Sequence, residues 1–82
     1  MQITFTQHAT VRMQERGVTA EQVLLTLAQP LLTVSAGNGC LEARGFIERH
    51  EVKMLLRVVY VDQVVISVVT VIATSQFKRY GL

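Results

Sequence analysis

The chain has 82 residues, of which 50% are hydrophobic and 17% are charged, and its formal net charge is +2. This length predicts a single domain over residues 1–82. The one cysteine excludes an internal disulfide, and the longest apolar stretch, residues 64–73, is far shorter than the ~20 residues that a membrane helix needs. The mixed, polar N-terminus does not resemble a signal peptide, so we expect a cytoplasmic protein with no membrane segment.

The N-terminal residues predict a short strand followed by a helix. Ile3 and Phe5 alternate with polar residues, which is typical of a strand. Thr6 is a suitable N-cap for a helix over residues 7–16, and Gly17 is a suitable residue to end that helix.

A second helix has the clearest periodic pattern in the chain. Thr19 and Gln22 have the spacing of a capping box, and Pro30 predicts that the helix ends near Ala28. Its apolar residues recur with helical spacing and are Ala20, Val23, Leu24, Leu27 and Ala28.

From residue 31 onward the pattern favours strands. The predicted strands cover residues 31–35, 41–47, 52–61 and 64–73, with turns at 37–39, 48–51 and 62–63 and a tail at 76–82. Gly45 suggests a bulge in its strand. Residues 64–73 are apolar on both faces, so we expect this strand at the centre of the sheet with the helices over one side. The residues therefore predict an α+β fold with an antiparallel sheet.

One row of side chains on the first helix is a candidate catalytic and binding site. His8, Arg12 and Arg16 are four residues apart, so each lies about one turn from the next. Ala9 and Met13 form the adjacent apolar stripe, which we expect to meet the sheet. The positive end of the helix dipole and Arg12 both disfavour an imidazolium, so His8 is expected to be neutral near pH 7 and able to accept a proton.

Further cations and a phenol complete the candidate site. Arg57 lies inside an apolar strand and needs a partner or a ligand, and Lys78, Arg79 and Tyr80 follow the last strand. These groups suit RNA cleavage by acid–base chemistry. His8 would take the proton of a 2′-hydroxyl, and Lys78 or Tyr80 would protonate or orient the leaving group. The residues expected to hold phosphate are Arg12, Arg16, Arg57 and Arg79. No cofactor is expected, and no ligand spacing indicates a metal site.

These segments also resemble a known family. The residues FTQHATVRMQERGVT, the helix ending in Gln29-Pro30, the VVYV and VVISVVTVIA strands and the FKRY end are similar to a bacterial domain-of-unknown-function family. That family opens with F-x-x-H-A-x-x-R-M-x-x-R-G and is related to RelE/BrnT-like toxins of toxin–antitoxin modules. The resemblance covers nearly the whole chain. The matching positions are His8, Arg12, Met13, Arg16 and Gly17 in the opening and Lys78 and Tyr80 at the end.

The resemblance carries expectations about fold and function. It implies a β-α-α-β-β-β-β order with both helices on one face of an antiparallel sheet. It also implies a bacterial cytoplasmic ribonuclease whose RNA target is free or ribosome-associated, with a cognate antitoxin that inhibits it.

Two interpretations stay open on sequence alone. One is the RNA-binding and RNA-cleaving toxin, and the other is a non-catalytic protein-interaction or dimerisation module of the same fold. The high apolar content of so small a domain favours a homodimer or another protein partner. Arg12 and Arg16 also have a structural alternative, which is pairing with Glu15, Glu48 or Glu51 on the surface.

Overall fold

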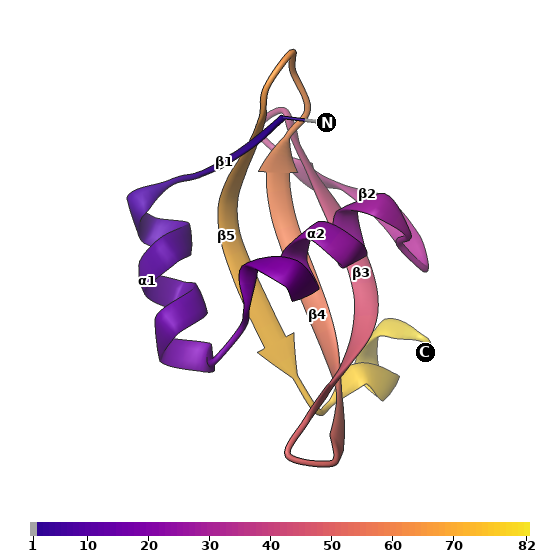
Figure 1. Cartoon of the computed structure of the whole chain (residues 1–82). Helices are drawn as coiled ribbons and strands as arrows, with labels where there is room; N and C mark the ends of the chain where they lie inside the picture. The colour runs from indigo at the N-terminus through magenta and orange to yellow at the C-terminus, as the bar shows by residue number, and fades with distance from the viewer. Residues whose placement is uncertain (1) are drawn as a thin grey trace.

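Five strands form one sheet in the order β1-β5-β4-β3-β2, and two helices lie on one face of it (Figure 1). The structure is a computed structural model that describes residues 2–82. In chain order the elements are β1 (Ile3–Phe5), α1 (Gln7–Arg16), α2 (Ala20–Ala28), β2 (Leu32–Gly37), β3 (Cys40–Arg49), β4 (Val52–Val61), β5 (Ile66–Thr74) and the 3₁₀ helix η1 (Phe77–Tyr80). The α+β class and the predicted order of helices and strands are confirmed.

One pair of strands departs from the predicted antiparallel sheet. β1 runs parallel to β5, with Ile3 opposite Ile66, while the other pairs are antiparallel. The strand predicted over residues 64–73 corresponds to β5, which is an interior strand between β1 and β4, whereas the middle strand of the sheet is β4. β5 is apolar on both faces because Val68 and Val71 are buried in the core, while Ile72 is half-buried beside Arg57 on the opposite face.

Two local details of the strands also differ from the sequence prediction. β5 begins at Ile66, two residues later than predicted. Val64 is 98% exposed and lies in the connection that follows Val61. β3 pairs with β4 through Gly45 without a bulge. Gly45 instead allows α2 to approach β3, since a Cβ at this residue would lie 3.3 Å from Thr26 Cγ2. The irregular pairings lie elsewhere, near the end of β2 and within β4 and β5.

Helix α1 is fixed to the sheet at both of its ends. Thr6 caps its first turn by accepting a hydrogen bond from the Ala9 N–H at 3.1 Å, and the Thr6 hydroxyl donates to the Val69 carbonyl at 2.9 Å. At the other end Gly17 adopts φ 65°, and Arg49 Nη1 donates to the Arg16 carbonyl. The Arg49 side chain therefore satisfies a backbone acceptor that the end of a helix leaves free.

The core lies between the helices and the sheet. Ala9 from α1 and Val23 from α2 are fully buried there with Leu56, Val58 and Val68 of the sheet. Met13 packs against the same cluster, which confirms that Ala9 and Met13 form the buried stripe of α1. Burying such side chains contributes roughly 1.5–3 kcal/mol for each large one.

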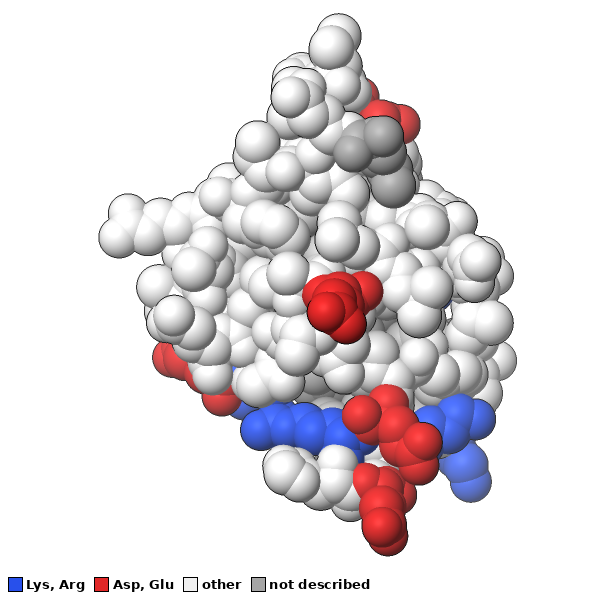
Figure 2. Space-filling model, in the orientation of Figure 1, with Lys and Arg blue, Asp and Glu red and all other residues white. Residues whose placement is uncertain are grey.

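The helix-bearing face has an uneven distribution of charge. Figure 2 shows the Lys and Arg side chains that are visible on this face at its lower end, by the hairpin of β3 and β4. Among residues 2–82, neither helix has the length and apolar character required to cross a bilayer.

The close contact at the end of α1 generates a test of stability. Gly17→Ala is expected to lower the free energy of unfolding by about 2 kcal/mol. The left-handed backbone costs an alanine roughly 1–2 kcal/mol, and the new Cβ would lie 2.8 Å from Arg49 Nη2, which must move. Urea unfolding followed by circular dichroism measures this loss.

Gly39→Ala is the matched control, because Gly39 has φ 77° and a Cβ at this residue would have no atom within 4 Å. The free energy of unfolding of this variant should fall by about 1 kcal/mol, which is the cost of the backbone conformation alone. Equal losses in the two variants would show that Arg49 does not support the end of α1.

Candidate functional site

An open groove of about 550 Å³ lies between α1 and the outer edge of β5. β1 pairs only with Ile66–Val68, whereas β5 continues to Thr74, so residues 70–74 have β4 as their only neighbouring strand. Figure 1 shows α1 beside this part of β5. The lining residues are His8, Arg12, Arg16, Thr70, Val71, Ile72, Ala73, Thr74 and Tyr80.

The groove brings together four of the candidate residues from two elements. His8, Arg12 and Arg16 come from the polar row of α1, and Tyr80 comes from η1, beyond the end of β5. Within the described residues 2–82, no acidic side chain lines the groove. Within residues 2–82 neither Arg12 nor Arg16 forms an ion pair, so the alternative of surface pairing with Glu15, Glu48 or Glu51 is not found. The groove therefore presents two guanidinium groups without a neutralising carboxylate.

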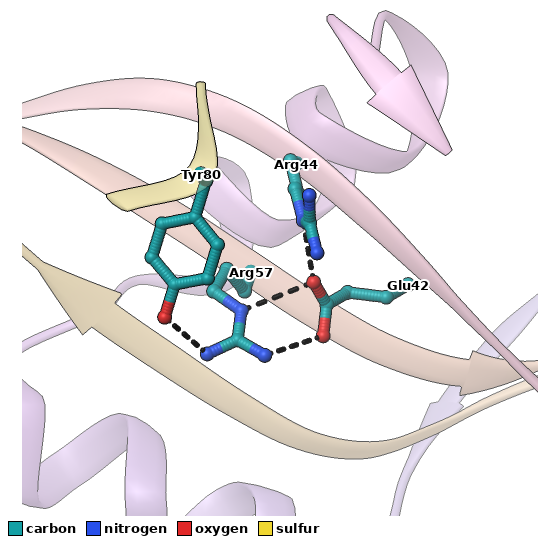
Figure 3. Close-up of polar contacts among 4 residues, drawn as sticks. All are labelled: Glu42, Arg44, Arg57 and Tyr80. Atoms are coloured by element: carbon teal, nitrogen blue, oxygen red, sulfur yellow. Dashed lines mark hydrogen bonds and ion pairs between the residues drawn. The ribbon is translucent and has the colours of Figure 1, made fainter. Parts of the chain in front are cut away.

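Arg57 contacts Tyr80 on the face of the sheet opposite the two helices (Figure 3). Its Nε and Nη2 donate to the two carboxylate oxygens of Glu42 at 3.0 and 2.9 Å, and its Nη1 donates to Tyr80 Oη at 2.9 Å. Arg44 Nε donates to the same carboxylate at 2.6 Å. The Arg57 charge thus has the partner that its position in an apolar strand requires, and this partner is Glu42.

Glu42 is a buried carboxylate held by two guanidinium groups. Its side chain is only 5% exposed. Burial raises the pKa of Glu42, but the hydrogen bonds and charges of Arg57 and Arg44 outweigh burial and hold the pKa below the ordinary value of a glutamate. Hydrogen bonding to Glu42 is also the main reason that the pKa of Arg57 is raised. The carboxylate is therefore ionised at neutral pH.

The same cluster holds the ring and the hydroxyl of Tyr80. The Arg44 and Arg57 guanidinium carbons lie 5.1 and 4.8 Å from the ring centroid, within the range of cation–π attraction. Because Tyr80 Oη accepts a hydrogen bond from Arg57, its own hydrogen points away from that donor. Tyr80 also lines the groove.

The candidates Lys78 and Arg79, and the second histidine of the chain, His50, lie outside the groove lining. Lys78 and Arg79 are exposed on η1 and form no ion pair within the described part of the chain. His50 is exposed in the turn between β3 and β4. Among residues 2–82 no three His, Cys, Asp or Glu side chains are grouped as metal ligands.

Sequence reasoning missed Glu42, although a signal for it exists. Glu42 and Arg44 alternate within a strand, so both side chains lie on one face of β3. That face also carries Arg57, which lies opposite Arg44 on β4. Knowing that β3 pairs with β4 would therefore have identified an acidic partner for Arg57.

Comparison of the chain with protein-family models, with curated proteins and with solved structures gives no match.

The buried carboxylate generates a test with a defined pH dependence. Glu42→Gln is expected to lower the free energy of unfolding by about 3 kcal/mol at neutral pH, because two guanidinium groups lose their counter-charge. The wild-type advantage should be complete above pH 4.5, the ordinary Glu value. It should shrink as the pH falls below that value, because the lowered pKa of the folded state means that the unfolded chain binds the proton first.

Denaturant titrations at several pH values measure this difference. Glu48→Gln is the control, since Glu48 lies on the same strand but forms no ion pair within residues 2–82. If Glu42→Gln lowers the free energy of unfolding by the same amount at every pH, the carboxylate of Glu42 is not ionised and paired in the folded protein.

Proposed function

We propose that the chain is a toxin of a toxin–antitoxin module that binds RNA in the groove beside β5 and cleaves it by acid–base chemistry. The observation that carries the proposal is the meeting of His8, Arg12, Arg16 and Tyr80 in one groove without an acidic residue. The resemblance of the opening and closing segments to a domain family related to RelE/BrnT-like toxins supports the same function.

The two guanidinium groups of α1 account for RNA binding. Arg12 and Arg16 are about 6 Å apart along the helix axis, given a rise of 1.5 Å per residue. Each can contact phosphate oxygens with its planar fork of donors. Lys78 and Arg79 lie outside the groove on η1, so in this proposal they contact phosphates beyond the cleaved bond.

Cleavage requires a base, an acid and charge stabilisation around one phosphate. His8 takes the proton from the 2′-hydroxyl, whose oxygen then attacks the adjacent phosphorus and displaces the 5′-oxygen of the next nucleotide. Tyr80 donates its proton to that leaving oxygen, and Arg12 stabilises the charge on the phosphoryl oxygens. Arg57 is engaged by Glu42, so its role is to orient the Tyr80 hydroxyl.

The biological setting belongs to the same proposal. The chain acts in the bacterial cytoplasm on free or ribosome-associated RNA, and a cognate antitoxin protein blocks it. Net positive charge supports an RNA target, since cations contributed by the protein displace the counterions of the phosphate backbone.

The role of His8 is tested by His8→Asn. The variant is expected to lower the rate of RNA cleavage by ~10²–10⁴-fold, which is the usual contribution of general acid–base catalysis. Cleavage of a fluorescent RNA by purified protein, together with growth after induction of the gene, measures the effect.

The control for this test is His50→Asn, because His50 is also exposed and Asn tolerates its φ of 50°. Unchanged cleavage in this control is expected. If the wild type neither cleaves RNA nor slows growth, or if both variants behave alike, the catalytic proposal is wrong.

Binding is tested separately through its salt dependence. Arg12→Gln is expected to weaken RNA binding and to reduce the slope of log K against log salt by about 0.7, the value for one phosphate contact on a single strand. Glu15→Gln is the control on the same helix, because Glu15 lies outside the groove lining. A salt slope that is unchanged in Arg12→Gln would contradict a phosphate contact in the groove.

A further inference from the structure

β2 forms the outer edge of the sheet opposite the groove. Within residues 2–82 it pairs only with β3. Val34 is half-buried, and the other five residues of β2 are exposed. Its sequence, LTVSAG, contains no charged residue and no proline. Such an edge presents unpaired backbone donors and acceptors to which another strand can add.

The two edges of the sheet are protected differently. At the other edge of the sheet β1 has only three residues. The part of β5 that extends beyond β1 faces α1, which carries Arg12 and Arg16. Short strands, nearby cations and a covering helix are the usual means of preventing edge pairing. β2 is longer than β1 and carries no charge of its own, and Arg44, which lies opposite Leu32 on β3, is paired with Glu42. The irregularity of β2 lies between Ser35 and Gly37 at its end. β2 is therefore the edge on which a further strand can be placed.

The segment of the chain that contains β2 is uncharged and has several exposed leucines. Residues 22–41, which include most of α2, all of β2 and the following turn, contain no Asp, Glu, Lys or Arg. Four leucines are exposed within this segment by 41–60%, namely Leu24, Leu25, Leu31 and Leu32. Figure 2 shows that the visible Lys and Arg side chains lie at the other end of this face. An interface at β2 would thus bury apolar side chains of a strand without charge. The charged side chains opposite Leu32 and Val34 on β3, Arg44 and Glu42, are already paired with each other.

We infer that β2 is the contact between two copies of this chain, which pair antiparallel about a two-fold axis at Val34. Each Val34 then lies opposite Val34 of the second copy, on the face that also carries Leu32. Thr33 and Ser35 lie on the other face and oppose each other across the axis, as a hydroxyl pair suited to cross-strand hydrogen bonding. The two sheets become one continuous sheet.

A second copy fits this edge better than a charged partner. A two-fold contact places the same patch on both sides, so an uncharged strand meets an uncharged strand without repulsion. β2 itself offers no charge for an acidic or basic strand to complement. Because the far edge is protected, pairing ends at two copies and does not continue into a fibre. The grooves lie at the outer ends of the joined sheet and stay open.

Analytical ultracentrifugation of the wild type and of strand variants tests the interface. The wild type is expected to sediment with the mass of two chains. Thr33→Lys and Val34→Lys are each expected to raise the dissociation constant at least about tenfold, because like charges are brought together at the axis. Val52→Lys is the matched control, since Val52 is 51% exposed on β4 and outside the interface.

The wild type alone gives a second readout, so the test does not depend on the folding of a variant. Hydrogen exchange of the β2 amides should slow as the protein concentration rises, while exchange of the exposed residues 62–64 should not change. A wild type that is monomeric at its highest attainable concentration overturns the inference. So does a dimer that both β2 variants leave intact, or β2 exchange that is independent of concentration.

Discussion

The short first strand is the constraint on which the candidate site depends. β1 pairs with only Ile66–Val68, so the rest of β5 has an edge without a strand. Helix α1 lies beside that edge because Ala9 is fully buried in the core and Thr6 holds the start of the helix on β5. The polar row next to the buried stripe is then directed toward the bare edge. The groove with the guanidinium groups of Arg12 and Arg16 therefore results from the short length of β1 and from the helical spacing of the two arginines on α1.

A second constraint operates on the opposite face, where η1 folds back over the sheet. Glu42 is the only buried charged residue within residues 2–82, and burying a carboxylate is unfavourable unless counter-charges surround it. Arg44 and Arg57 provide them, which leaves the trio with a net charge of +1 and the ring of Tyr80 close to both guanidinium groups. The ion pairs thereby connect the face of the sheet opposite the helices with the groove, because Tyr80 contacts Arg57 on that face and also lines the groove.

Local signals in the sequence predicted the elements well. Thr6, Gly17 and the capping box of Thr19 and Gln22 mark helix ends through contacts within a few residues, and all of them are observed. Strand neighbours are set by contacts between distant residues, so neither the parallel pairing of β1 nor the central place of β4 followed from periodicity. For the same reason the row of His8, Arg12 and Arg16 was visible in the sequence, whereas the partner of Arg57 required the register of β3 on β4.

The most direct measurement of the central claim is a backbone NMR titration with a single-stranded RNA that carries a 2′-O-methyl group on every ribose. Such an RNA keeps its phosphates but cannot be cleaved by attack of its own 2′-hydroxyl. The account predicts that chemical-shift changes concentrate on the α1 residues that line the groove, on residues 70–74 of β5 and on Tyr80. Changes confined to β2 and α2, or no change at saturating RNA, would contradict it.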